Sequence, residues 1–558
     1  MKSALWPLPL LLTAVLAAPP PAPPAAALAA ISGASLKART AVLSSDEFEG
    51  RAPGTAGEEK TVAYLAGEFR KLGLAPGYTD GTYFQPVPMV GIVSRPALNF
   101  TVGASRLDLT FINDYVANSR HVTPQVAIHD SDVVFVGYGI VAPEYGWDDY
   151  KGLDVRGKTV VMLINDPPIS DPQHPGQLDP AMFKGKAMTY YGRWTYKYEI
   201  ATERGAAACF IVHETGPAAY PWAVVANSWG RENFDLDAPD GNAGRVPVEG
   251  WLTLDAAQRL CAAAGQDFAA LKRTALSREF RPVALGAKCS CTVENTFRHI
   301  RSRNVLAALE GSDPTLKQEW IVYTAHWDHF GRDPRRTGDQ IFNGAHDNAS
   351  GTAVLLELAQ AYRALPVPPK RSVLFLSVTG EEQGLLGSQF YTRNPVHPLE
   401  RTLANINIDG AQFLGPSRDL EAIGYGNTTI DELAAAWLAR DGRVLTPDSE
   451  PEKGYFFRSD EFEFAKMGVP AFYTHYGVDI VGQPPGYGAA KRAEYLANDY
   501  HKVTDEIRPW WNFEGAALDT KLFFEVGWEI ANGDRWPEWK PGSEFKARRE
   551  EMLRAAGR

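Results

Sequence analysis

Cysteine is scarce in this chain, and none lies where metal ligands are expected. Its 558 residues include only four cysteines: Cys209, Cys261, Cys289 and Cys291. Because Cys289 and Cys291 are separated by a single residue, a bond between them would be strained, and we expect each to pair elsewhere or stay free. We interpret all four as structural thiols or staples.

An excess of basic residues is also missing. Lysine and arginine number 56 against 67 aspartates and glutamates, so the formal net charge is -11. This balance excludes the basic footprint of a nucleic-acid-binding protein or of a protein held on an anionic membrane surface. With 45% hydrophobic and 22% charged residues, the composition is ordinary for a soluble globular protein, and the length predicts two or three domains.

Long apolar runs are absent beyond the amino terminus. There, a positively charged start, an apolar run at residues 8–18 and small residues up to Ala29 predict a secretory signal peptide over residues 1–29, cleaved near Ala29 or Ala30. The run is too short to span a bilayer, and the prolines of 19–24 would interrupt a longer helix. An uncleaved anchor is the alternative. We predict an exported protein, periplasmic or extracellular, with no stable membrane association after cleavage.

The pattern of apolar and turn-forming residues changes twice along the mature chain. Residues 30–96 combine helical spacing of apolar residues with a turn-rich loop, whereas 97–292 read mostly as strands with frequent turns. Alternating strand and helix patterns return at 293–535, before a charged tail at 536–558. We therefore predict an α/β domain, built from 30–96 and 293–535, with a mostly-β insert at 97–292.

Aromatic residues are dense in one stretch of the insert. Residues 188–198 read MTYYGRWTYKY. Such a stretch either packs a domain interface or lines one wall of a substrate pocket, since aromatic surfaces give concave sites their apolar lining. Arg193 lies within it, and is either a carboxylate-binding group or an ordinary solvated arginine.

Residues able to bind a metal follow short apolar runs between residues 321 and 410. Runs of this length suit buried parallel strands, and open α/β sheets place their sites at the carboxyl ends of strands. One member instead leads into an apolar-faced helix at 352–359. We expect the side chains to converge on one crevice. They are His326, Asp347, Glu382 and Asp409.

A loop at residues 498–505 adds a further histidine, His501. The set then holds imidazole and carboxylate groups, a mixture that suits Zn²⁺. Five ligands are too many for one tetrahedral zinc, but they suit two zincs bridged by a carboxylate and a water. Metals about 3.5–4 Å apart can together lower the pKa of a bridging water and polarise a carbonyl. We predict two Zn²⁺ per chain.

Two further carboxylates stand beside these residues. Adjacent residues at a strand end point to opposite sides, so Glu382 can bind metal while Glu381 faces the substrate as a general base. Asp328 lies two residues beyond His326 and could accept the other ring proton of that histidine.

The motifs AHWDH, GAHDNASG, TGEEQGLLGS, NIDG and DYHKVTDE resemble those of the M28 family of zinc-dependent exopeptidases. The resemblance covers essentially the whole mature chain, and the insert resembles the protease-associated domain that many members carry. It implies a zinc exopeptidase-like, phosphorylase/hydrolase-like fold, in which helices flank a mixed, mostly parallel central sheet.

The resemblance also implies how the ligands divide. His326 and Asp409 would hold one zinc, and Glu382 and His501 the other. Asp347 would bridge the two ions.

Catalytic roles follow from the same resemblance. Glu381 would activate the metal-bridging water and pass its proton to the leaving amine, and Tyr500 would steady the tetrahedral oxyanion. One position departs from the family pattern, because related chains often read Ser-Asp-His where this chain has Ser459-Asp460-Glu461. The departure leaves the pocket near this loop, and with it specificity, open.

The leading functional hypothesis is an aminopeptidase that removes residues from the amino termini of peptides. The alternative is a carboxypeptidase or dipeptidase of the glutamate carboxypeptidase type, which would need cationic groups such as Arg193 or Arg458 to bind the substrate carboxylate. A catalytically inactive binding protein and a one-zinc glutaminyl-cyclase-type transferase share the fold. The intact ligand set argues against both.

Overall fold

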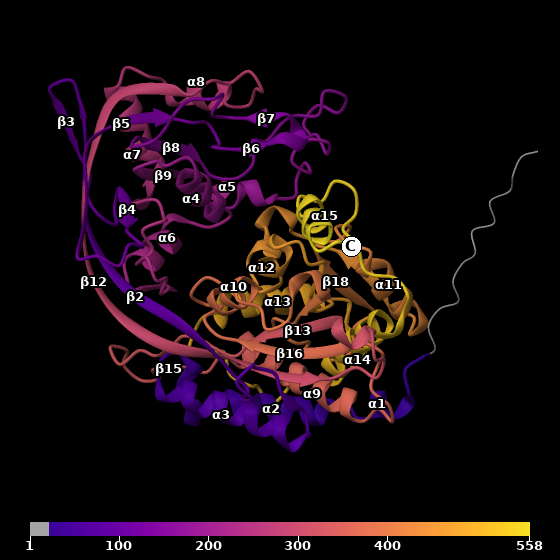
Figure 1. Cartoon of the computed structure of the whole chain (residues 1–558). Coiled ribbons are helices and arrows are strands. Elements are labelled where there is room, and N and C mark those ends of the chain that lie inside the picture. The colour runs from indigo at the N-terminus through magenta and orange to yellow at the C-terminus, as the bar shows by residue number, and fades with distance from the viewer. Residues whose placement is uncertain (1–21) are drawn as a thin grey trace, which may run out of the picture.

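Two long strands join the two units of the protein (Figure 1). The computed structural model describes residues 22–558. Strands β2 (Phe84–Val102) and β12 (Val283–Leu309) pair antiparallel, and Ala97 faces Thr292 in their ladder. These two residues are the first and the last of the predicted insert. The chain therefore enters and leaves the insert side by side, on a continuous β-ribbon.

The larger unit is built on a mixed sheet with the strand order β19-β18-β20-β17-β13-β16-β12. Four central strands run parallel: β16 (Ser372–Val378), β13 (Trp320–His326), β17 (Thr402–Asn407) and β20 (Ala471–His475). On either side, β12 and β18 (Asp419–Ile423) are antiparallel to their inner neighbours, and β19 (Val444–Pro447) closes the edge beside β18. The predicted mixed, mostly parallel sheet is confirmed.

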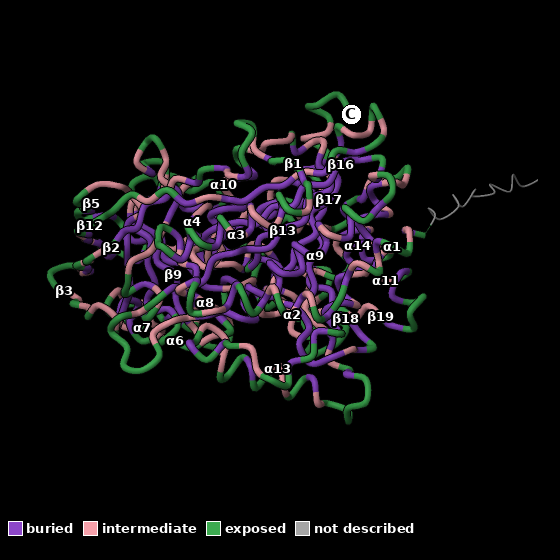
Figure 2. Tube along the Cα trace, turned by 90° about the horizontal axis from the view of Figure 1, so that it is seen from below, coloured by how far each residue is buried: buried purple, intermediate pink, exposed green. Residues whose placement is uncertain are grey.

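Helices cover both faces of this sheet, which explains why its strands are apolar almost throughout. Alternate residues of β13 point to opposite faces. Ile321 and Tyr323 pack into the core formed with α9 (Gly351–Arg363) and α14 (Glu514–Asn532). Val322 packs into a second core beneath α10 (Leu386–Arg393) and α12 (Glu461–Lys466). In Figure 2 the trace along β13, β16, β17 and α9 is coloured mostly as buried.

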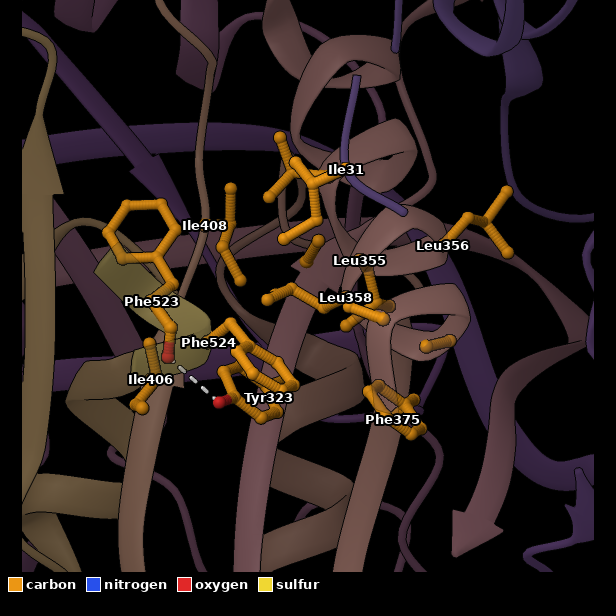
Figure 3. Close-up of a cluster of buried hydrophobic side chains, with 14 of the residues drawn as sticks. Ile31, Tyr323, Leu355, Leu356, Leu358, Phe375, Ile406, Ile408, Phe523 and Phe524 are labelled. Carbon is orange, nitrogen blue, oxygen red and sulfur yellow. Dashed lines mark hydrogen bonds between the residues drawn. The ribbon is translucent and has the colours of Figure 1, made fainter. Parts of the chain in front are cut away.

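The first core brings α14 very close to the sheet (Figure 3). The hydroxyl of Tyr323 donates a hydrogen bond of 2.9 Å to the backbone oxygen of Phe523, and it lies 3.0 Å from the hydroxyl of Tyr362. A Cβ atom added to Gly527 would lie 1.8 Å from the Tyr323 hydroxyl. Only glycine allows the helix to approach this closely.

Gly527→Ala is therefore expected to destabilise the protein by about 1–3 kcal/mol, the usual cost of overpacking a core. The matched control is Gly67→Ala within α3 (Ala56–Lys71), where an added Cβ meets nothing within 4 Å. That change should stabilise by up to about 1 kcal/mol, because alanine favours a helix interior. Thermal unfolding followed by circular dichroism measures both. Equal effects of the two substitutions would contradict the close approach of α14.

The described amino-terminal residues pack onto the larger unit. Helix α1 (Ala25–Ala29) buries Ala27 in the same core as α9, and Gln360 Nε2 donates a hydrogen bond of 2.7 Å to the backbone oxygen of Ala30. Cleavage near Ala29 or Ala30 would remove this packed helix, and the signal peptide stays a prediction. The apolar run at 8–18 lies outside the described residues. Within residues 22–558, no helix has the length and apolar character that crossing a bilayer requires.

The insert continues the sheet beyond β12 in the order β5-β8-β9-β11-β4. These strands are β5 (Gln125–Phe135), β8 (Thr159–Leu163), β9 (Ala208–His213), β11 (Val248–Thr253) and β4 (Tyr115–Asn118). The insert holds more helix than the sequence suggested, namely α4 (Trp194–Glu203), α6 (Trp222–Trp229), α7 (Leu254–Ala263) and α8 (Phe268–Thr274). Their apolar faces pack on its sheet. All four cysteines lie buried and free in this unit.

The predicted charged tail packs onto the larger unit. Trp539 is buried and its indole N–H donates a hydrogen bond of 2.9 Å to the backbone oxygen of Gly468. Helix α15 (Lys546–Ala555) follows, with Arg549 bonded to the backbone oxygen of Leu399 at 3.0 Å.

Candidate metal centre

The predicted ligands gather at the carboxyl ends of the parallel strands. His326 is the last residue of β13, and Asp409 follows the end of β17. Glu381 and Glu382 follow β16. The parallel register of these strands brings the four residues to one edge of the sheet.

The carboxylate of Asp347 lies between two imidazole rings. Its Oδ1 is 3.4 Å from Nε2 of His326, and its Oδ2 is 3.1 Å from Nε2 of His501. Each imidazole faces a second carboxylate as well. Asp409 Oδ1 lies 3.3 Å from His326 Nε2, and Glu382 Oε2 lies 3.4 Å from His501 Nε2. The five predicted ligands thus form two clusters that share Asp347.

These separations suit metal ions. Two ligand atoms bound at about 2.0–2.1 Å in tetrahedral geometry lie about 3.3–3.4 Å apart, close to the distances within each cluster. The centre also crowds several carboxylates into a buried place, which a cation would neutralise. The donor atoms present therefore fit a pair of zinc ions.

Proximity alone offers other groupings, in which Glu381 joins His326 and Asp409, and His329 joins Asp347 and Glu382. The contacts argue against His329 as a ligand. Its Nδ1 lies 2.6 Å from Oε1 of Glu382, which leaves Oε2 of that carboxylate to face His501. We therefore assign His329 the role of orienting Glu382.

Glu381 lies at the edge of the first cluster and lines a cleft. Its Oε2 is 3.9 Å from Nε2 of His326, farther than the carboxylates of Asp347 and Asp409. Burial raises the pKa of the Glu381 carboxyl well above its usual value, and the charges of Asp409 and Glu382 raise it further. Glu381 is thus placed beside the ligands and open to the cleft.

Asp328 takes a different role from the one predicted. Nδ1 of His326 lies 3.1 Å from the backbone oxygen of Asp328, and 3.8 Å from its carboxylate. The carboxylate instead accepts the backbone N–H of Glu381 at 3.1 Å. The chain turns directly after β13, and this turn brings the carbonyl rather than the side chain back to the ring. Asp328 therefore positions Glu381 through its side chain and His326 through its backbone.

Other supporting residues come from distant parts of the chain. The carboxylate of Asp505 accepts the backbone N–H groups of His346 and Asp347, each at 3.1 Å, and so holds the loop that carries Asp347. Ser459 donates a hydrogen bond of 2.8 Å to Oδ2 of Asp409. Sequence reasoning missed both, because no local pattern links them to the ligands. The only signal in the sequence was that Asp505 lies in the motif DYHKVTDE and that Ser459 lies in the segment that departs from the family pattern.

Glu461, the residue that departs from the family pattern, is buried and does not reach the cleft. Glu461 is fully buried and accepts a hydrogen bond of 2.7 Å from Nδ2 of Asn407. Burial raises the pKa of its carboxyl well above the usual value. Its neighbours Arg458 and Ser459 line the cleft, whereas Glu461 does not.

A cleft of about 530 Å³ runs between the two units and reaches the metal centre. The larger unit contributes Asp347, Glu381 and Tyr500, and the insert contributes Trp194 and Tyr198. The ring of Tyr500 stacks on that of His501 with their centroids 3.7 Å apart. Burial raises the pKa of the Tyr500 phenol, so the hydroxyl keeps its proton.

The aromatic stretch of the insert serves both predicted purposes. Trp194 and Tyr198 line the cleft, while Tyr190 packs against the larger unit with its ring 4.9 Å from that of Phe462. The insert therefore forms one wall of the cleft.

Residues 304–520 match peptidase family M28. Among curated proteins, the chain is 36% identical over 242 residues to a probable zinc metalloprotease of Pyrenophora teres f. teres (42% of this chain, 49% of that protein). It is 27% identical over 218 residues to aminopeptidase YwaD of Bacillus subtilis (39% and 40%). The chain spans a quarter of aminopeptidase NAALADL1 of Mus musculus, at 31% identity over 197 residues and 32% of this chain. It thus spans less than half of each of these relatives.

Among solved structures, an aminopeptidase from Aneurinibacillus sp. strain AM-1 aligns with 92% of this chain and 97% of its own, at 18% identity and a TM-score of 0.46. The family match begins at residue 304, after the insert, and includes all five predicted ligands. The part of the chain that carries the metal centre thus matches peptidase family M28.

Proposed function

We propose that the protein is a di-zinc exopeptidase that acts as an aminopeptidase on peptides. The observation that carries this proposal is the Asp347 carboxylate, with one oxygen toward His326 and the other toward His501. A carboxylate placed in this way suits a bridge between two metal ions. The family match and the relatives named as aminopeptidases support the same assignment.

Bound zinc would supply Lewis acidity and lower the pKa of water, and the ligands to hold it are the five described above. Glu381 faces the cleft beside them, so its carboxylate would take a proton from the attacking water and deliver it to the leaving amine. Tyr500 also lines the cleft, and its hydroxyl would donate a hydrogen bond to the oxyanion.

Carboxylates at the metal end of the cleft favour a substrate with a free amine. Glu381 and Asp409 both line the cleft, and either would attract an ammonium group. We also propose, from the amino-terminal sequence, that the protein is exported. A mature terminus that begins before Ala25 would preserve helix α1.

The test is hydrolysis of matched dipeptides with either a blocked amine or a blocked carboxylate, together with free-amine p-nitroanilides of leucine, alanine, phenylalanine and proline. We expect blocking of the amine to abolish cleavage, because the free amine is then missing. Chelation should remove activity, and zinc should restore it. Zinc analysis should find two ions per chain.

Two results would overturn the proposal. Cleavage that persists with a blocked amine and needs a free carboxylate would instead establish the carboxypeptidase alternative. A ratio near one zinc per chain, with no hydrolysis of any substrate, would contradict the di-zinc peptidase altogether.

A further inference from the structure

Arg51 is a fully buried arginine of the amino-terminal segment. It ends η1 (Asp46–Arg51), and its exposed fraction is 1%. Among residues 22–558, every hydrogen bond of its guanidinium goes to a backbone oxygen. Burial lowers the pKa of this group to about 10, so it stays cationic at neutral pH. Because a cation is costly to remove from water, such a group persists in a protein interior only where hydrogen bonds compensate.

Four backbone oxygens accept these hydrogen bonds, and they belong to three separate segments of the chain. Nε donates to Trp327 at 2.9 Å, and Nη2 donates to Gly344 at 2.9 Å. Nη1 donates to Asn343 at 2.6 Å and to Leu43 at 2.8 Å. A guanidinium carries five N–H donors in a rigid fork, so one arginine can hold several segments at once.

Two of these segments carry predicted metal ligands. Trp327 directly follows His326, the last residue of β13. Gly344 precedes Asp347 in the same loop. Asp505 holds this loop by two of its backbone N–H groups, and the guanidinium holds it by two of its carbonyl groups. The same side chain therefore joins the backbone beside His326 to the loop of Asp347.

The backbone of Arg51 supports a third ligand indirectly. Its carbonyl oxygen accepts the backbone N–H of His329 at 3.4 Å, and His329 orients Glu382. The chain makes a left-handed turn here, with φ of 69° at Gly50 and 54° at Arg51, a conformation that is unfavourable for a residue with a side chain. A Cβ atom added to Gly50 would lie 2.5 Å from the backbone oxygen of Gly331. The turn therefore lies tightly against the loop that follows β13.

We propose that Arg51 is a positioning residue of the metal centre, which fixes the loop after β13 against the loop that carries Asp347. The inference rests on the proposed di-zinc function, although the order of the loops can be tested without metal. Arg51 does not line the cleft, so it acts through these loops and not on the substrate. It also lies outside residues 304–520, which match the peptidase family. The amino-terminal segment would thus help to build a centre to which it contributes none of the predicted ligands.

Arg51→Met and Arg51→Lys test this proposal in the full-length protein. Methionine removes all four hydrogen bonds, whereas lysine keeps the charge but has only three donors and no rigid fork. We expect zinc affinity to fall about 10–100-fold in Arg51→Met, as for other residues that orient metal ligands, and by about tenfold in Arg51→Lys. In both variants kcat should fall while KM changes little, because Arg51 does not touch the substrate. Competition with a chelator of known affinity measures zinc binding.

Hydrogen exchange of the chelated protein provides a readout that needs neither metal nor turnover. Backbone N–H groups of residues 343–350 should exchange about tenfold faster in the Arg51 variants than in the wild type, as for the loss of roughly one net hydrogen bond. If Arg51→Met does not fold, Arg51→Lys carries the test. Thermal melting checks the folding of each variant.

Arg549→Met is the matched control. Arg549 is also buried, and its guanidinium donates to the backbone oxygens of Leu399 at 3.0 Å and Thr402 at 2.9 Å. Burial likewise lowers its pKa to about 10. Thr402 begins β17, at the end of the strand remote from the metal centre. This variant should melt at a lower temperature but keep wild-type zinc affinity and wild-type exchange over residues 343–350.

Each outcome has a distinct meaning. A folded Arg51 variant with wild-type zinc affinity and wild-type exchange over residues 343–350 would overturn the proposal. Equal losses in Arg51→Met and Arg549→Met would assign the effect to general stability, and would overturn it too. If the wild-type protein binds no zinc, the proposed di-zinc function fails. Exchange in the chelated proteins then decides alone: faster exchange only in the Arg51 variants supports the positioning role, and unchanged exchange overturns it.

Discussion

Glu381→Gln is expected to lower kcat by about 10²–10⁴-fold, the range that a positioned general acid–base contributes. The substitution keeps the shape of the side chain and removes its ability to accept a proton. Because Glu381 lies farther from His326 than Asp347 and Asp409 do, the variant should keep its zinc. KM should change little, since the loss falls on the chemical step. Steady-state hydrolysis of Leu-p-nitroanilide and zinc analysis measure the two quantities.

Glu450→Gln is the control for this substitution. Glu450 also lines the cleft, but its carboxylate pairs with Lys453 at 2.6 Å and makes no contact with the metal centre. We expect its activity to stay within about twofold of the wild type, because a partly exposed ion pair contributes little. If Glu381→Gln lost its zinc together with its activity, Glu381 would be a ligand rather than the base.

Asp347→Ala is expected to lower zinc content from about two ions per chain to one or fewer. Among the residues that the structure describes, this side chain alone faces both imidazoles, so its removal weakens both clusters at once. Activity should fall by at least about 10³-fold, since metal catalysis contributes several kcal/mol of transition-state stabilisation and each 1.4 kcal/mol is tenfold in rate. Elemental analysis of the dialysed protein and the p-nitroanilide assay test this.

Asp448→Ala provides the matched comparison. Asp448 lines the same cleft, and its carboxylate accepts the backbone N–H of Glu450 at 2.8 Å rather than facing an imidazole. This variant should keep a full complement of zinc. An Asp347→Ala protein that retained two zincs would show that the clusters do not share this residue.

Much of the central sheet could be predicted from the sequence because its strands are marked locally. The segments at β13 and β16 are continuous apolar runs, and such runs occur where both faces of a parallel sheet are covered by helices. The polar residue that ends each run then lies at the carboxyl edge of the sheet. For this reason His326 and Glu382 could be predicted as site residues from the sequence.

The helices of the insert were harder to predict from the sequence. Trp194, Tyr196 and Tyr198 alternate with polar residues, a pattern that does not mark a helix, yet they lie within α4. Tyr196 and Tyr198 pack into the core of the insert and Trp194 packs against it, while Trp194 and Tyr198 also line the cleft. Here tertiary packing on both sides of the helix outweighs the local pattern.

The sequence by itself determined the residue types of the metal centre, because metal ligands and a general base are chosen by chemistry and stand in recognisable local motifs. Only the tertiary structure decided which atoms meet. It placed Nδ1 of His326 beside a backbone carbonyl, set His329 against Glu382, and brought Trp194 and Tyr198 of the insert to the wall of the cleft. Such pairings depend on side-chain directions and on contacts between units far apart in the chain, which no local pattern encodes.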